Sequence, residues 1–220
     1  MSTSSRPSST RTALAAAGGG VVLLAAVVGF AVGLPEVAGA EDAEGGQGPG
    51  VEALAPLPES LPGDLVSLTS PEMPAEIVEQ SGGAEALADI VDSGAANVAE
   101  LYGEPSAFGI YGRTDGSVLV TVTVGPGEPG LFVPDGTPIS PEVQGVARST
   151  LDFVETDNGV CSVIYAQPVA AGQAADPAEL PQRVHCQSGA DGLLYDVTSQ
   201  GLTIDETVEA VDTLLEVEEG

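Results

Sequence analysis

An uncharged stretch near the start of the chain, Ala13 to Pro35, constrains the whole protein because it is too long and too apolar for an ordinary surface segment. A transmembrane helix needs about 20 apolar residues, and this stretch has that length. Its strongly apolar part, Val21 to Leu34, is shorter and is typical of the hydrophobic region of a secretory signal. Arg6 and Arg11 precede it and are expected to stay cytoplasmic by the positive-inside rule. The stretch therefore predicts export of everything that follows it.

Two fates of this N-terminal segment stay open. Pro35 breaks the helix, and Ala38-Gly39-Ala40 then supplies the small-x-small pattern of a signal-peptidase site before Glu41. Cleavage after Ala40 would release the chain as a secreted protein. Without cleavage, residues 1–40 would act as a signal-anchor transmembrane segment, and the membrane itself would be a partner. In both cases residues 41–220 lie outside the cytoplasmic membrane.

The exported remainder is strongly acidic. The sequence has 33 acidic and five basic residues, a net charge of −28 and no lysine, and every acidic residue except Glu36 follows Ala40. Nucleic acids and anionic headgroups are bound through Lys and Arg, so nucleic-acid binding is excluded. The acidic residues are spread along the chain, which favours a solvated, self-repelling surface. A composition rich in Ala, Gly and Val is similar to that of exported proteins of high-GC bacteria, which indicates a protein of the bacterial cell envelope.

The two cysteines of the chain, Cys161 and Cys186, predict one disulfide in an exported protein. The bridge would close a loop of roughly 26 residues, worth about 3 kcal/mol in the chain-entropy model. A catalytic thiol is the alternative, because His185 stands next to Cys186. Consecutive side chains on a strand point to opposite faces, however, so these two residues cannot form a nucleophile–base pair there.

The exported part divides into a linker and a domain. Residues 41–64 are rich in Gly, Pro and acid, which predicts a disordered linker, although Leu54 to Leu61 could lie against the domain. Residues 65–220 contain enough apolar sequence for an extracytoplasmic domain. Leu65 to Ile77 is interpreted as a helical turn between loops. The segment Ala84 to Tyr102 predicts an amphipathic helix, because one set of apolar residues recurs at helical spacing: Leu87, Ile90, Val91, Val98, Leu101 and Tyr102.

From Ala107 the apolar period changes to two, which predicts strands in three hairpins. Their turns carry Asp-Gly or Asn-Gly pairs, and the paired segments are 107–112 with 117–124, 146–154 with 160–167, and 182–187 with 193–199. A C-terminal helix then begins at the capping box Thr203 to Glu206. Hairpins need no crossover helix, so we expect an α+β fold: an antiparallel sheet of about six strands with the N-terminal and C-terminal helices packed on one face.

The sequence offers no catalytic, cofactor-binding or metal-binding set of residues. His185 is the only histidine, and it shares a strand face with Arg183 and Gln187, which indicates a polar, solvent-facing row rather than a metal site. The glycines of 125–130 match G-x-G-x-x-G, but prolines follow where a helix should begin, so no dinucleotide is expected. The turn at 156–159 lacks the spacing of a calcium loop.

We therefore expect a non-catalytic module that binds an envelope protein or ligand and needs no cofactor. Two alternatives stay open. One is a hydrolase that acts through two converging carboxylates, which requires buried acids with raised pKa values. The other is an acidic surface that binds cations such as calcium.

Overall fold

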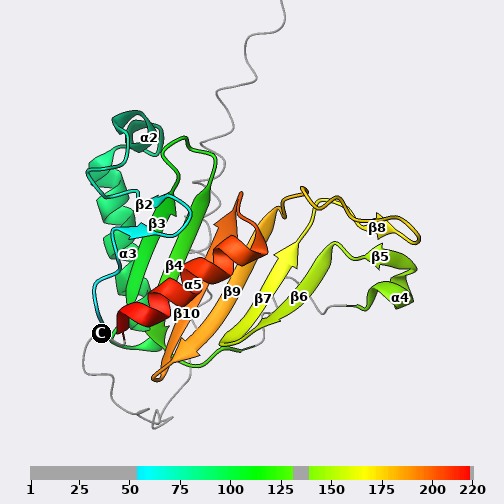
Figure 1. Cartoon of the computed structure of the whole chain (residues 1–220). Coiled ribbons are helices and arrows are strands. Elements are labelled where there is room, and N and C mark those ends of the chain that lie inside the picture. Colours follow the sequence, from blue (N-terminus) through cyan, green and yellow to red (C-terminus); the bar gives the residue numbers. More distant parts are fainter. Residues whose placement is uncertain (1–53, 131–138, 219–220) are drawn as a thin grey trace, which may run out of the picture. The chain divides into compact units, whose positions relative to one another are not determined.

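The computed structural model describes residues 54–130 and 139–218 (Figure 1). The chain divides into two units at Ala40, and all described residues belong to the second, Glu41–Gly220. The predicted signal segment and its cleavage site at Ala38, Ala40 and Glu41 lie outside the described residues. Among the helices that the structure does describe, none combines the length and the apolarity that crossing a membrane requires.

An eight-stranded antiparallel sheet forms the centre of the domain, so the expected α+β class is confirmed. Its order is β1-β2-β3-β4-β10-β9-β7-β6. The strand bounds are β1 (Ser60–Leu61), β2 (Leu65–Ser67), β3 (Ala107–Gly112), β4 (Leu119–Pro126), β6 (Leu151–Thr156), β7 (Gly159–Ile164), β9 (Arg183–Ala190) and β10 (Leu193–Gln200). The three predicted hairpins are β3–β4, β6–β7 and β9–β10, and Figure 1 shows the last of these between the other two.

The sheet has more strands than the six that the hairpins predict. β1 and β2 come from residues assigned to the linker and to a helical turn. The linker boundary at residue 64 is therefore wrong, because the chain already packs on the domain from Leu54 onward. β1 pairs with β2, and β2 pairs with β3, so these residues extend the sheet at one edge.

The expected strand 146–154 is divided in two. Its first part, β5 (Val146–Arg148), follows the short helix α4 (Pro141–Gln144) and pairs with β8 (Val169–Ala170) in a separate two-stranded sheet. Ser149 explains the break, because its buried hydroxyl bonds to Gln144 Nε2 at 2.7 Å and so turns the chain before β6 begins. Figure 1 shows α4, β5 and β8 projecting beyond β6 and β7.

The two long helices cover opposite faces of the sheet, so the expectation that both lie on one face is wrong. Paired residues of antiparallel strands share a face and successive residues alternate, which places Tyr111 with Val120 and Ile110 with Thr121 on opposite sides. α5 (Ile204–Glu218) packs in the core that contains Tyr111 and Val120. α3 (Ala84–Tyr102), after the short α2 (Ala75–Gln80), packs in the core that contains Ile110. β3 carries apolar residues on both faces, and each face therefore needs its own helix.

The bounds of α3 match the prediction, but its last turn does not. Leu101 and Tyr102 were expected in the buried face, and they are 57% and 67% exposed. Leu87, Ile90 and Val91, which the same pattern predicts to be buried, do pack in the core with Ile110 of β3. The buried stripe therefore ends before the helix does.

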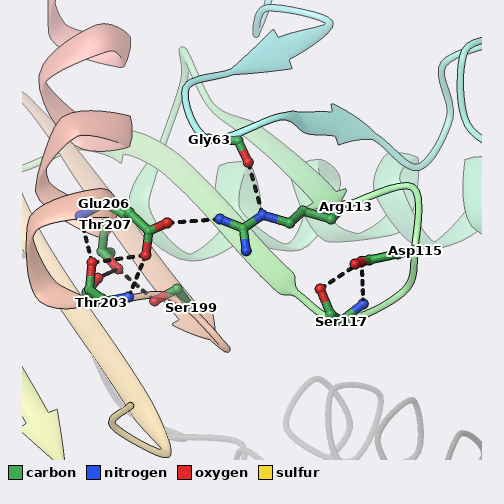
Figure 2. Close-up of polar contacts among 8 residues, drawn as sticks. All are labelled: Gly63, Arg113, Asp115, Ser117, Ser199, Thr203, Glu206 and Thr207. Atoms are coloured by element: carbon green, nitrogen blue, oxygen red, sulfur yellow. Dashed lines mark hydrogen bonds and ion pairs between the residues drawn. The ribbon is translucent and has the colours of Figure 1, made fainter. Parts of the chain in front are cut away.

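The N-terminus of α5 is held by the predicted capping box (Figure 2). Glu206 Oε2 accepts hydrogen bonds from the backbone N–H and the hydroxyl of Thr203, both at 2.8 Å. Its other oxygen, Oε1, lies 2.8 Å from Arg113 Nη2, and Arg113 Nε donates to the carbonyl of Gly63. The Thr203 backbone bond, followed by the Thr203 hydroxyl and Arg113, lowers the pKa of Glu206. One carboxylate thus ties α5 to the β3–β4 turn, which reaches the β1–β2 turn through Gly63.

Candidate binding cleft

A cleft of about 250 Å³ opens beside the first half of β3. It exists because β2 has three residues whereas β3 has six, and β2 pairs only with Tyr111 and Gly112. After Leu68 the chain turns away, with Ser70 N–H bonded to the carbonyl of Ser67. The lining residues come from four separate segments: Leu57, Pro58, Glu59, Ser67, Thr69, Ser70, Pro71, Val91, Phe108, Gly109 and Tyr111.

The walls of the cleft differ in chemistry. Phe108 and Val91 belong to the apolar packing between β3 and α3, and they give the cleft an apolar side. Among the polar lining residues, Ser70 Oγ donates to Glu59 Oε2 at 3.4 Å, and Ser67 Oγ lies 2.9 Å from Thr69 Oγ1. The cleft therefore offers apolar surface together with hydroxyls and one carboxylate.

Tyr111 fixes the wall formed by residues 57–59. Its ring is 1% exposed, and its hydroxyl donates to the carbonyl of Pro58 at 2.8 Å. Burial raises the pKa of Tyr111 to about 12. Gly109 permits the close approach of this wall, because a Cβ there would lie 2.9 Å from Leu57 Cδ1. The wall is consequently part of the folded domain rather than of a free linker.

A second concave region of about 510 Å³ lies where the hairpin ends of β4, β6–β7 and β9–β10 meet. Its lining residues come from 127–129, 158–159 and 189–193, and they combine four glycines with the polar side chains of Glu128, Asn158 and Asp191. The Gly-rich stretch 125–130 contributes here: Gly127 N–H bonds to the carbonyl of Gly192, and Gly130 N–H bonds to Gln187 Oε1. That stretch connects hairpin ends and does not open a helix, as a dinucleotide site would require. The described lining residues include no aromatic side chain, whereas Phe108 and Tyr111 line the cleft beside β3, so this region is the weaker candidate.

The predicted disulfide is confirmed. Cys161 on β7 and Cys186 on β9 are direct cross-strand partners, with an S–S distance of 2.05 Å and side chains 0% and 1% exposed. Both sulfur atoms lie in the core under α5, and neither is available as a nucleophile. His185 lies on the opposite face of β9, as strand alternation predicts.

His185 takes part in a polar row, but the row is not as open to solvent as the sequence predicts. Its Nε2 lies 2.8 Å from both carboxylate oxygens of Asp196, and Gln187 Nε2 donates to the same carboxylate at 3.0 Å. The side chains of His185 and Asp196 are 18% and 27% exposed. The row thus links β9 to β10 across the sheet, and none of its members lines either concave region.

The hydrolase alternative requires acids with raised pKa values, and the two shifts found among the described acidic residues are both downward. The pKa of Asp115 is lowered, chiefly by the Ser117 hydroxyl, and that of Glu206 is lowered as well. A general acid needs the opposite shift, so neither residue is a candidate for that role. Residues 54–130 and 139–218 contain no group of three or more acidic, histidine or cysteine side chains that could hold a metal ion.

The fold defines an α+β domain built on a disulfide-bonded antiparallel sheet, with a cleft beside the first half of β3, where β2 does not pair with it. No protein-family model, curated protein or solved structure matches the chain. The functional proposal accordingly rests on the cleft itself.

Proposed function

We propose that this protein is a non-catalytic binding module of the bacterial cell envelope and that the cleft beside β3 receives its partner. The observation that carries the proposal is the composition of that cleft. Specific binding sites combine apolar surface with a few placed polar groups, and here Phe108 and Val91 line the same cleft as Glu59 and three hydroxyls. The cleft is also built by the folded core, through Tyr111, so its shape exists before a partner arrives.

The proposed location is outside the cytoplasm. Disulfides persist in oxidising compartments, and the buried Cys161–Cys186 bridge supports such a location. The N-terminal stretch Ala13–Pro35 supplies the export signal in this proposal, and residues 41–53 connect it to the domain. The domain is then either released after Ala40 or held at the membrane by residues 1–40.

Site-specific photo-crosslinking in the native host tests the proposal. A photoreactive residue replaces Thr69, which is exposed and lines the cleft. The matched control replaces Glu76, which is exposed on α2 and does not line the cleft. We expect a discrete crosslinked product from position 69 and none from position 76. Equal labelling at both positions, or none at position 69, would remove the cleft as the binding site.

A further inference from the structure

We propose that the cleft binds an extended peptide segment of a partner protein, which pairs its backbone with the edge of β3 at Phe108 and directs a basic side chain toward Glu59. The inference deepens the proposed function and rests on it. It names the class of partner, an extended basic peptide, and the mode of recognition, strand addition to the sheet.

The backbone of β3 provides the pairing edge. Leu68 N–H donates to the carbonyl of Ile110 at 2.8 Å, so the Ile110 carbonyl points away from β4. Backbone direction alternates along a strand, and Phe108, two residues earlier, therefore points its N–H and carbonyl to the same side. In the described part of the chain no strand lies beyond β3 at this position, because β2 pairs only as far as Tyr111. Phe108 is also a lining residue of the cleft.

The side chains around this edge set the pattern of the peptide. A residue paired with Phe108 would share its face of the sheet, where Val91 lies, and an apolar side chain fits there. Its neighbours in the peptide would point to the other face, beside Leu57 and Pro58. The hydroxyls of Ser67 and Thr69 line the cleft next to the last residue pair between β2 and β3, Ser67 with Tyr111.

Charge decides which peptide can enter. Glu59 is the one charged residue among the described residues that line the cleft, and it is exposed. The preceding residues of the same chain, 41–53, contain acidic and no basic residues, so Glu59 repels them. A second copy carries a net charge of −28 and no lysine, which disfavours it as a partner too. A basic segment of another protein is the occupant that the charge distribution favours.

The first test asks whether the backbone of β3 is unpaired at Phe108 in the free protein. It measures amide hydrogen exchange of the full-length chain in lipid nanodiscs. In the free protein we expect the Phe108 amide to exchange rapidly, whereas the amides of Gly109 and Tyr111, which face β4, exchange slowly. A slowly exchanging Phe108 amide would show that the edge is already occupied and would overturn the inference.

The second test uses a phage-displayed library of random peptides, selected against the same full-length protein. We expect selected peptides to be basic, to protect the Phe108 amide, and to lose about tenfold or more in affinity when the backbone nitrogen that pairs with Phe108 is methylated. Glu59→Gln should weaken them by about fivefold. The matched variant Glu76→Gln, which makes the same chemical change away from the cleft, should leave affinity unchanged.

The outcomes separate this inference from the proposed function. Strand addition is overturned if the selected peptides bind Glu59→Gln with unchanged affinity and leave the exchange of the Phe108 amide unchanged. It is also overturned if the library yields no peptide. If position 69 still crosslinks to a partner in the native host, the cleft remains the binding site and only its mode of recognition is refuted. If position 69 gives no crosslink, the proposed function fails as well.

Discussion

Replacement of Tyr111 by phenylalanine tests whether the cleft wall is held by the folded core. The Tyr111 hydroxyl is buried and donates to the Pro58 carbonyl at 2.8 Å. Removing it leaves that carbonyl without its donor, which costs about 1–2 kcal/mol of the free energy of unfolding. The phenylalanine ring keeps the packing of the tyrosine ring, so the fold should survive.

The pH dependence of the same variant gives a sharper test. Burial raises the pKa of Tyr111 to about 12 in the folded protein, whereas an unfolded tyrosine titrates near pH 10. The raised pKa means that the neutral phenol stabilises the folded state. This contribution is fully present below about pH 10 and is lost as the pH rises through about 12. A shift of about two units corresponds to about 2.7 kcal/mol.

The stabilities of the two proteins should therefore converge. The wild type is more stable at neutral pH by about 1–2 kcal/mol, and it loses this advantage between about pH 10.5 and 12. Urea unfolding followed by circular dichroism at a series of alkaline pH values measures both curves. Tyr102→Phe, at an exposed position, is the control and should follow the wild type. An identical alkaline loss in wild type and Tyr111→Phe would refute the assigned role of Tyr111.

Three further predictions concern the scaffold. The double replacement Cys161→Ala and Cys186→Ala should lower the free energy of unfolding by about 3 kcal/mol, because the bridge closes a loop with a sequence separation of 25. Chemical denaturation measures the loss, and unchanged stability would contradict it. Glu206→Ala should lower the free energy of unfolding by about 1 kcal/mol above about pH 5. The difference from the wild type should shrink as the pH falls through the lowered pKa of Glu206, because the wild type then loses the same contacts. A difference that does not change with pH in the acid range would count against the capping box. Gly94→Val should lower the thermal midpoint by an amount equivalent to about 2 kcal/mol, since even a Cβ at Gly94 would overlap the ring of Phe108. A neutral result would contradict the packing of α3 on this face.

Strong local patterns account for the parts of the fold that the sequence predicts. The apolar residues of Ala84–Tyr102 recur at helical spacing and stop at Gly103, and α3 has those bounds. Asp-Gly and Asn-Gly pairs specify turns through local backbone conformation, and all three hairpins form. The disulfide follows from two cysteines on neighbouring strands of this layout.

Other elements depend on contacts that no local pattern contains. β1 and β2 are two and three residues long, too short to show a period of two, and they form because the edge of β3 provides a template. The sequence contains one signal that the two helices cover opposite faces of the sheet. The run Phe108-Gly109-Ile110-Tyr111 carries large apolar side chains on both faces of one strand, and one-sided coverage cannot bury both.

The cleft could not be predicted from the sequence, because it too depends on contacts between distant segments. Its lining comes from segments near residues 58, 69, 91 and 108, which only the folded sheet brings together. One signal pointed to part of it: Leu54, Leu57 and Leu61 recur between prolines in a stretch otherwise typical of a linker, and all three pack on the core. Apolar residues in a predicted linker are a reason to expect that it docks.

The most direct test of an exported, disulfide-bonded binding module is the intact mass of the protein purified from its native host, with free thiols alkylated before and after reduction. We expect no alkylation before reduction and alkylation of Cys161 and Cys186 after it. The mass of a chain that begins at Glu41 would identify a released domain. The mass of a chain that still includes residues 1–40 would identify a membrane-anchored one. Alkylation of both cysteines without reduction would contradict the account, because it would place the folded chain in a reducing compartment.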